Sequence, residues 1–363
     1  MFDDVYKNAR VLITGHTGFK GAWLSQWLLL LGAQVAGVSL NVPSSPSVFE
    51  ALGLRKQLRH ADGDVRHFET LLPLLQDVQP EAVFHLAAQP LVRTSYDEPR
   101  ETFDTNVTGT LNLLEAVRHT PSVRAVVIVT TDKCYENRNW EFGYRETDRL
   151  GGNDPYSASK ACAELVTHAY HQSFFSNDEG PRVASARAGN VIGGGDWATD
   201  RIVPDCIRAW SAGETALIRN PAHVRPWQHV LEPLSGYLLL GQKLYQSDRR
   251  VAGEAFNFGP AHESCQTVET LVDTMSGGWP DAKWARAESR MGPKAEATLL
   301  RLNCDKSMRR LRWHPVLSFD ESIRFTLDWY RRFYAERGDT ARMTEQQIRT
   351  YHELATARQH VWA

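Results

Sequence analysis

The stretch "TGHTGFKG", Thr14 to Gly21, follows an apolar run at residues 10–14 and opens a segment of helical length. Gly15, Gly18 and Gly21 recur at three-residue intervals within it. In a strand–loop–helix unit the first glycine permits a tight turn and the second lets the backbone approach a pyrophosphate. The third lets helix and strand pack closely, and the helix N-terminus supplies N–H donors. The stretch therefore predicts a dinucleotide-binding loop.

The first half of the chain alternates β-rich runs with helical segments, which is typical of a parallel sheet with helices on both faces. Strands are predicted at residues 10–14, 34–40, 59–64, 82–87, 124–130 and 182–188. Helices are predicted at residues 19–31, 70–77, 101–119, 155–174 and 319–334. We predict an α/β fold, a Rossmann-type doubly wound parallel sheet with a smaller, mixed C-terminal substrate-binding lobe. Residues 1–190 and roughly 224–260 would form the dinucleotide domain, and residues 191–223 and 261–363 the lobe.

Composition narrows the class of protein. Among 363 residues, 41 are basic and 43 acidic, which argues against a nucleic-acid or membrane-surface partner. The most apolar stretch, residues 22–40, is too interrupted by polar residues and glycine to span a bilayer. Five scattered cysteines without C-x-x-C spacing predict free thiols, no metal site and a reducing compartment. We therefore expect a cytoplasmic protein.

The acidic residue that often binds the adenosine ribose, about 20 residues after such a loop, is missing. The second strand ends "GVSLN", residues 37–41, and the next acid is Glu50. No arginine stands there to receive a 2′-phosphate, so NAD is favoured over NADP. His16 and Lys20 are expected to place positive potential within the phosphate loop. The alternative, that both are solvated loop residues, stays open.

The segment "YSASK" places Tyr156 and Lys160 four residues apart near the start of a predicted helix, and therefore on one face. A tyrosine with a pKa near 10 is a poor base at neutral pH. A cation one turn away, together with a positive nicotinamide ring, would favour the phenolate. The phenolate would take a proton from a sugar hydroxyl while hydride leaves the same carbon. The spacing arises by chance on many helices, so its weight comes from its combination with the glycine loop.

These features, with "HLAAQ" (85–89), "NVTGTLNLLEA" (106–116) and "FNFGP" (256–260), resemble the extended short-chain dehydrogenase/reductase family of nucleotide-sugar enzymes. Blocks such as "TDKCYENR", "GGNDPYSASK", "NVIGGGDW" and "RPWQHVLEPLSGYL" are similar to the CDP-glucose branch of its dehydratases, over about residues 7 to 335. The resemblance implies an NAD cofactor, a nucleotide-sugar substrate (CDP-glucose), and a homodimer or homotetramer. It also implies that the cofactor is held by Gly15, His16, Thr17, Gly18, Phe19, Lys20, Gly21, Asp64, Val65, Leu86, Ala87, Ala88, Gln89 and Asn106.

Three functional side chains, Thr131, Asp132 and Lys133, follow the apolar run at residues 126–129. The resemblance implies dehydration of CDP-D-glucose to CDP-4-keto-6-deoxy-D-glucose, by C4 oxidation, loss of water across C5 and C6, and hydride return to C6. After oxidation, such a reaction needs a group to polarise the ketone, a base for the C5 proton and an acid for the 6-hydroxyl. We expect Thr131, Lys133 and Asp132 in these roles, with Tyr156 and Lys160 completing the catalytic set. A strand-end turn with a salt-linked lysine is the structural alternative.

Four further residues are candidates for substrate binding. By the same resemblance, Asn190 in "RAGNVIGGGDW" would contact the substrate pyrophosphate, and Asn257 in "FNFGP" would bind substrate. Arg201 and Arg225 suit phosphate or ribose because a guanidinium matches phosphate oxygens in pairs. Salt-bridged surface arginines are the alternative. Two other functions stay open: an NAD-dependent nucleotide-sugar epimerase, and a non-catalytic dinucleotide-sensing regulator, which would be expected to lose Tyr156 or Lys160.

Overall fold

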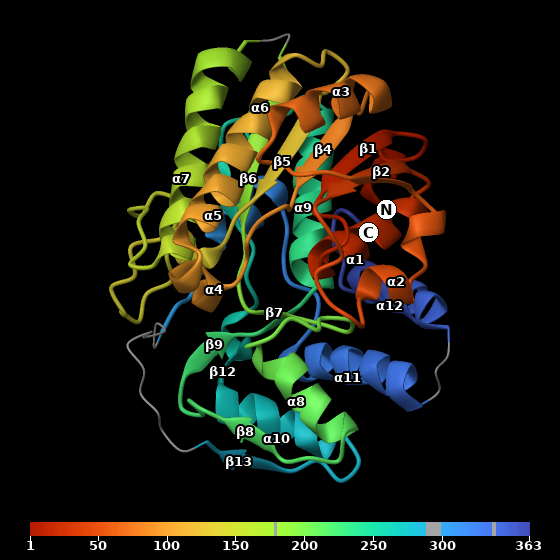
Figure 1. Cartoon of the computed structure of the whole chain (residues 1–363), viewed down its shortest axis with the longest axis vertical. Helices are drawn as coiled ribbons and strands as arrows, with labels where there is room; N and C mark the ends of the chain where they lie inside the picture. The colour runs from red at the N-terminus through yellow and green to blue at the C-terminus, as the bar shows by residue number, and fades with distance from the viewer. Residues whose placement is uncertain (178–179, 288–298, 336–338) are drawn as a thin grey trace.

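A seven-stranded sheet forms the centre of the larger part of the molecule (Figure 1). The computed structural model describes residues 1–177, 180–287, 299–335 and 339–363. All pairings within this sheet are parallel. In spatial order its strands are β11 (Ala255–Asn257), β6 (Arg182–Arg187), β5 (Ala125–Val129), β4 (Ala82–His85), β1 (Arg10–Thr14), β2 (Gln34–Ser39) and β3 (Arg59–Asp62). This order is that of a doubly wound Rossmann sheet, so the predicted fold class is confirmed.

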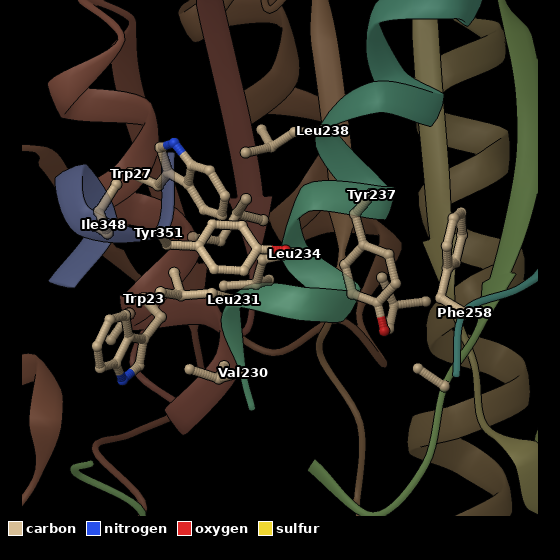
Figure 2. Close-up of a cluster of buried hydrophobic side chains, with 14 of the residues drawn as sticks. Trp23, Trp27, Val230, Leu231, Leu234, Tyr237, Leu238, Phe258, Ile348 and Tyr351 are labelled. Atoms are coloured by element: carbon tan, nitrogen blue, oxygen red, sulfur yellow. The ribbon is translucent and has the colours of Figure 1, made fainter. Parts of the chain in front are cut away.

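Helices cover both faces of the sheet, and successive side chains of a strand point to opposite faces. Val11 and Ile13 of β1 join one core cluster, whereas Leu12 joins the other. The first cluster includes Trp23, Trp27, Leu234 and Tyr351, which Figure 2 shows packed around the helix Leu231–Tyr245. The helices that pack on this face are α1 (Phe19–Leu30), α9 (Leu231–Tyr245) and α12 (Thr340–Ala357), and those on the other face include α3 (Phe68–Val78) and α6 (Gly109–Arg118).

The remaining elements of the larger part are short or flank the sheet. The longest of them is α7 (Pro155–Tyr170), which begins with Asp154 accepting a hydrogen bond from the Ser157 N–H as its N-cap. The others are η1 (Phe2–Asp4), α2 (Val48–Ala51), η2 (Leu54–Lys56), α4 (Val92–Asp97), α5 (Pro99–Phe103), the π-helical η3 (Asp104–Thr108), η4 (Asp132–Cys134) and the π-helical η5 (His171–Phe175).

A smaller lobe lies below the carboxyl ends of the sheet strands in Figure 1. It is built on strand pairs of two or three residues and on helices packed beside them. The pairs are β10 (Gln228–His229) with β7 (Val191–Ile192), β12 (Cys265–Thr267) with β9 (Val224–Pro226), and β13 (Trp284–Arg286) with β8 (Ala216–Ile218). The other elements are α8 (Ile202–Ser211), η6 (His262–Ser264), α10 (Val268–Gly277), the π-helical η7 (Ser307–Leu311) and α11 (Phe319–Ala335).

The C-terminal residues pack on the first helix, although the predicted division placed all of residues 261–363 in the lobe. The rings of Trp27 and Tyr351 meet edge to face at 5.7 Å, and those of Phe2 and Trp362 stack at 5.2 Å. The Phe2 N–H donates to the Trp362 carbonyl at 2.7 Å. These contacts correct that division for α12 and the residues after it. The rest of the proposed division, with a dinucleotide domain and a substrate lobe, stays a prediction.

The predicted elements agree with the observed ones to within a few residues, with instructive exceptions. The predicted helix at 101–119 begins as α5 and continues through the π-helical η3 into α6. The seventh strand, β11, the helices α8, α9, α10 and α12 and the short elements of the lobe were not predicted. In the described ranges, no helix combines the length and the hydropathy needed to cross a bilayer.

Candidate active site

The glycine loop joins β1 to α1 and has the geometry that its sequence predicts. Gly15 has φ +76°, and an added Cβ there would lie 2.7 Å from the Ala87 nitrogen. A Cβ at Gly21 would lie 2.1 Å from the Gly15 carbonyl oxygen, so loop and helix pack closely there. At Gly18 an added Cβ would meet only the Gly15 oxygen, at 3.4 Å. Gly18 therefore borders open space, as a backbone cradle for a pyrophosphate requires.

The His16 side chain lies inside the protein, contrary to our expectation of positive potential in the loop. Its ring is fully buried and hydrogen-bonds with Ser39 Oγ at 2.9 Å and His60 Nδ1 at 2.7 Å. Burial, followed by the neighbouring His60, lowers the His16 pKa to about 4. The imidazole is therefore neutral at pH 7, and only its backbone remains a candidate for cofactor binding. Thr17 also turns away, because its hydroxyl donates to the Asn41 carbonyl at 2.6 Å.

The other predicted cofactor residues follow the neighbouring strands. Leu86, Ala87, Ala88 and Gln89 follow β4, which pairs with β1, and Asp64 and Val65 follow β3. Asn106 of η3 fixes the first of these segments, since its side chain accepts from the Gln89 N–H at 2.9 Å and donates to Ser159 Oγ at 2.9 Å. The Asp64 carboxylate is paired with Arg66. Because strands of a parallel sheet end at one edge, these residues lie at the same edge of the sheet as the glycine loop.

The trio Thr131-Asp132-Lys133 lies where β5 ends and the 3-10 turn η4 begins. Thr131 is the N-cap of this turn, and its hydroxyl donates to Asp132 Oδ1 at 3.0 Å. Asp132 is fully buried, whereas the Lys133 side chain is 37% exposed with its Nζ 3.9 Å from Asp132 Oδ1. A Cβ added at Gly189 would lie 2.0 Å from Asp132 Oδ2, so only glycine leaves room for this carboxylate. The turn thus presents a hydroxyl, a carboxylate and an amine together.

Tyr156 and Lys160 lie on the first turns of α7, facing the same strand end. Lys160 Nζ donates to the Val129 carbonyl, the last residue of β5, at 3.2 Å. Burial raises the Tyr156 pKa to about 12, and a hydrogen bond with Thr131 opposes this rise. The cation that lowers the Tyr156 pKa is Arg201, which sequence reasoning had placed only at the substrate. Burial lowers the pKa of Lys160 to about 8.

Next to Tyr156 and Lys160 on α7, a buried ion pair joins this helix to the sheet. Glu164, one turn after Lys160, accepts two hydrogen bonds from Arg187 of β6, each at 2.9 Å. It also accepts from Ser185 Oγ at 2.6 Å and Thr130 Oγ1 at 2.5 Å. Because the carboxylate bridges the ends of β5 and β6 to α7, it holds the strand-end turn and this helix in one arrangement. Sequence reasoning missed this pair, which joins residues 23 positions apart.

The predicted substrate residues separate into two groups. Asn190 Nδ2 donates to Asp132 Oδ2 at 3.3 Å, and Arg201 forms an ion pair of 2.8 Å with Asp196 while interacting with Tyr156. Both therefore lie beside the predicted catalytic residues. Arg225 lies on β9 in the lobe, hydrogen-bonded to the Val224 carbonyl at 3.0 Å.

Asn257 does not fit the predicted role in substrate binding. Its side chain is fully buried, and its Nδ2 donates to the carbonyls of Tyr144 and Asn303 at 2.9 and 3.0 Å. Its Oδ1 accepts from the Tyr135 hydroxyl at 2.7 Å. Both amide protons are used within the protein, so Asn257 is a structural residue of β11. The motif "FNFGP" identified the strand end but not the direction of the side chain.

A cavity of about 290 Å³ lies between the turn η4 and the lobe. Its lining joins the turn to three segments of the lobe, around residues 226–228, 259–265 and 301–308. Arg301 is the cationic residue of this lining, and Asp132 and Asp305 are its carboxylates. A second hollow of about 500 Å³, at residues 42–51 and Phe333, contains none of the predicted site residues.

Residues 12–326 match the profile of the GDP-mannose 4,6 dehydratase family. The chain belongs to this family. The resemblance to nucleotide-sugar dehydratases that the sequence predicted is therefore confirmed. The chain is 48% identical over 331 residues to the CDP-glucose 4,6-dehydratase of Salmonella typhimurium, covering 90% of this chain and 91% of that protein. It is 30% identical over 345 residues to a dTDP-glucose 4,6-dehydratase of Streptomyces antibioticus, covering 88% and 92%.

Two solved structures have the same fold as this chain. A dTDP-glucose 4,6-dehydratase of Streptomyces venezuelae with NAD bound superposes with a TM-score of 0.74 at 26% identity, covering 90% of this chain and 99% of that one. A UDP-glucose 4-epimerase of Thermotoga maritima superposes with a TM-score of 0.75 at 22% identity, covering 89% and 99%. The similarity to the epimerase shows only that the two chains share a fold.

Proposed function

We propose that the chain is an NAD-dependent hydro-lyase that converts CDP-D-glucose to CDP-4-keto-6-deoxy-D-glucose. The observation that carries this proposal is the turn after β5, where Asp132 and Lys133 lie 3.9 Å apart beside Tyr156. An epimerase needs the tyrosine and lysine of α7 for oxidation at C4 and for return of the hydride. A dehydratase needs, in addition, an acid and a base for the elimination. The choice of CDP-glucose rests on the 48% identical Salmonella relative.

The chain holds NAD at the glycine loop, because the cradle at Gly18 is open and a side chain there would fill it. When bound, NAD accepts the hydride from C4 and later returns it to C6. Tyr156 takes the O4 proton, helped by the positive charge of Arg201. Thr131 is expected to hydrogen-bond O4 and so to polarise the 4-ketone, which makes the C5 hydrogen acidic.

Elimination is assigned to the other two residues of the turn. We assign removal of the C5 proton to Lys133 and protonation of the departing 6-hydroxyl to Asp132. Asn190 and Thr131 each hydrogen-bond one Asp132 oxygen, so the carboxyl group is held in one orientation. We further assign Asn190, Arg201 and Arg225 to the nucleotide diphosphate, and the cavity that begins at Asp132 to the nucleotide.

A substrate panel with product analysis tests the proposed function. Purified protein with NAD is mixed separately with CDP-, dTDP-, GDP- and UDP-glucose, and the products are identified by NMR. We expect a 4-keto-6-deoxy sugar with CDP-glucose as the best substrate. A product that retains its 6-hydroxyl and inverts C4 would establish the epimerase alternative. Absence of any product despite NAD binding would favour the regulator.

We also propose a homodimer or homotetramer in the cytoplasm. Large apolar side chains are exposed on adjacent helices, Leu111 of α6 at 40% and Leu165 of α7 at 58%. A second copy of the chain would cover them, and the five free cysteines fit a reducing compartment. Light scattering of the purified protein measures the assembly. Leu165→Lys should lower the measured mass, and a monomeric wild-type protein would refute the assembly.

A further inference from the structure

The cavity between the turn η4 and the lobe offers few side chains for polar contact with a ligand. Most of its lining consists of small or apolar residues. The amide of Gln228 bonds within the protein, since its Nε2 donates to the carbonyls of Gly189 and Phe258 at 2.9 and 3.1 Å and its Oε1 is shut off from solvent. Besides Asp132, the polar side chains that remain are those of Arg301, Asn303 and Asp305.

These three residues belong to one short segment whose backbone is fixed. The Tyr144 N–H donates to the Arg301 carbonyl at 2.8 Å, and the Asn303 N–H donates to the Tyr144 carbonyl at 2.9 Å. Asp305 begins a helical turn that continues as η7, and its N–H donates to Asn303 Oδ1 at 3.0 Å. Asn303 Nδ2 donates to Asp305 Oδ2 at 3.2 Å, which orients the carboxylate. Among the described residues, the other oxygen, Asp305 Oδ1, has no hydrogen-bond or ion-pair partner.

Arg301 differs from the cations of the glycine loop and the catalytic residues, because those already have partners. Lys20 Nζ, which the sequence placed in the phosphate loop, donates to the Tyr237 hydroxyl of α9 at 3.4 Å. Arg201 is paired with Asp196 at 2.8 Å. Within residues 1–177, 180–287, 299–335 and 339–363, no hydrogen bond or ion pair joins the Arg301 guanidinium to another group. Its five N–H donors are therefore available to a ligand in the cavity.

A free donor and a free acceptor from one segment match the edge of a nucleobase. Cytosine presents an amino group at N4, which donates, and a carbonyl at O2, which accepts. Uracil and thymine carry a carbonyl, O4, in place of the amino group, and an aspartate carboxylate can only accept. The reacting hexose is assigned to Asp132, and the base lies at the opposite end of a nucleotide sugar. The base therefore falls to the lining that segment 301–305 provides.

We propose that Asp305 selects cytosine among the pyrimidines. Its free carboxylate oxygen accepts a hydrogen bond from the N4 amino group, while the Arg301 guanidinium donates to O2. Asn303 is the positioning residue, because its amide orients the carboxylate. Uracil or thymine would place O4 against the same oxygen, so that two acceptors face each other and the carboxylate stays unpaired. This inference rests on the proposed function and names the side chain that directs it to CDP-glucose.

The ratio of kcat/KM for CDP-glucose to that for UDP-glucose measures the selection, because the two substrates differ only in the base. For the wild type we expect a ratio of about 100 or more, since uracil loses one hydrogen bond to a charged group and adds a repulsion. Asp305→Asn introduces an amide that can donate to O4, so the ratio should fall by about 10- to 100-fold, mainly through a gain with UDP-glucose. Calorimetry with CDP and UDP, in the presence of NAD, should show the same change in the ratio of Kd values.

Substitutions at Arg301 should change affinity without changing selectivity. Cytosine and uracil both carry O2, so Arg301→Met should raise the Kd for CDP and the Kd for UDP by about tenfold each and leave their ratio unchanged. Arg301→Lys keeps a positive charge and should recover part of this affinity. A changed ratio in Arg301→Met, with none in Asp305→Asn, would transfer the selection to Arg301 and overturn the proposal.

Asp320→Asn, at an exposed aspartate in the first turn of α11, is the matched control and should keep the wild-type ratio. The ratio compares two ligands of one protein, so a smaller folded fraction in a variant leaves it unchanged. If no nucleotide sugar is turned over, the proposed function fails, and the Kd values for CDP and UDP still test Asp305. If CDP-glucose is converted and Asp305→Asn keeps the wild-type ratio, only the assignment of Asp305 fails.

Discussion

The ends of β1 and β5 face the same site but contribute to it in opposite ways. At β1 the backbone acts: glycines make room, and the polar side chains of His16 and Thr17 hydrogen-bond within the protein. At β5 the side chains act: Thr131, Asp132 and Lys133 project a hydroxyl, a carboxylate and an amine. Binding of a diphosphate needs many amide donors and little specificity of side chain, whereas proton transfer needs particular functional groups. Substitutions at the ends of the two strands should therefore impair different steps: binding of the diphosphate at β1 and proton transfer at β5.

The largest effect is expected at Tyr156, which completes the β5 end. Tyr156→Phe removes the group that takes the O4 proton, so C4 oxidation should fall by about 100- to 10,000-fold. Binding of NAD and CDP-glucose should persist, because the ring still fills its buried place. Single-turnover formation of NADH, followed by absorbance, measures the step. A loss of less than about tenfold would mean that another group takes this proton.

Lys133 should separate oxidation from elimination. Lys133→Met keeps a stem of similar length without the amine, so enzyme-bound NADH should accumulate with 4-ketoglucose and turnover should fall about 100-fold or more. In D₂O the wild type should place deuterium at C5, and this variant should not. Asp132→Asn is the matched comparison: it should slow loss of water but leave C5 exchange intact. Normal C5 exchange in Lys133→Met would remove lysine from the role of base.

A substitution at Gly18 tests the end of β1, where the space left for the cofactor matters and the functional groups of the side chains do not. Gly18→Val should fold, because an added Cβ there meets only one atom at 3.4 Å. The larger side chain should occupy the space of the pyrophosphate and weaken NAD binding by about 10- to 100-fold, the cost of overlap in a close-packed site. Gly21→Ala is the contrasting control and should impair folding itself. Calorimetry and thermal melting measure both; unchanged NAD affinity in folded Gly18→Val would refute the loop assignment.

The smallest effect is expected at His16, which acts on stability. Its pKa is about 4 in the folded protein and near 6.5 when unfolded, so the unfolded chain binds more protons between these values. The contribution of His16 to the free energy of unfolding is therefore fully present above pH 6.5. It is lost as the pH falls toward 4, and the loss is about 2 kcal/mol at pH 5. His16→Asn should remove this part of the pH dependence in urea melts at pH 7 and 5. The same change in stability between pH 7 and 5 in both proteins would contradict this role of His16.

Much of the fold was predictable because its signals are local. Strand periodicity, the glycine loop and the spacing of Tyr156 and Lys160 lie within short segments, and all appear at the expected places. The helix α12 was missed although Ile348, Tyr351 and Ala355 follow helical spacing and are buried. That spacing is a local signal and predicts a helix with one buried face.

The remaining errors concern the direction of side chains. His16 and Asn257 sit in the expected loops, yet their polar atoms bond to segments that the local sequence does not specify. Arg201 influences Tyr156 because the chain returns from the lobe, and the fold decides that return. A motif therefore locates a residue on a strand end, but only tertiary packing decides which neighbour it meets.

The contact between Lys20 and Tyr237 has a consequence for how the enzyme becomes active during synthesis. It joins residues 217 positions apart, and α9 packs on strands that are made much earlier. During translation the glycine loop and the end of β5 emerge long before the helix that completes their surroundings. The nascent chain must therefore hold an open sheet face, with Phe84 and Val127 uncovered, until residue 245 has left the ribosome. Catalytic competence should appear late and abruptly along the growing chain.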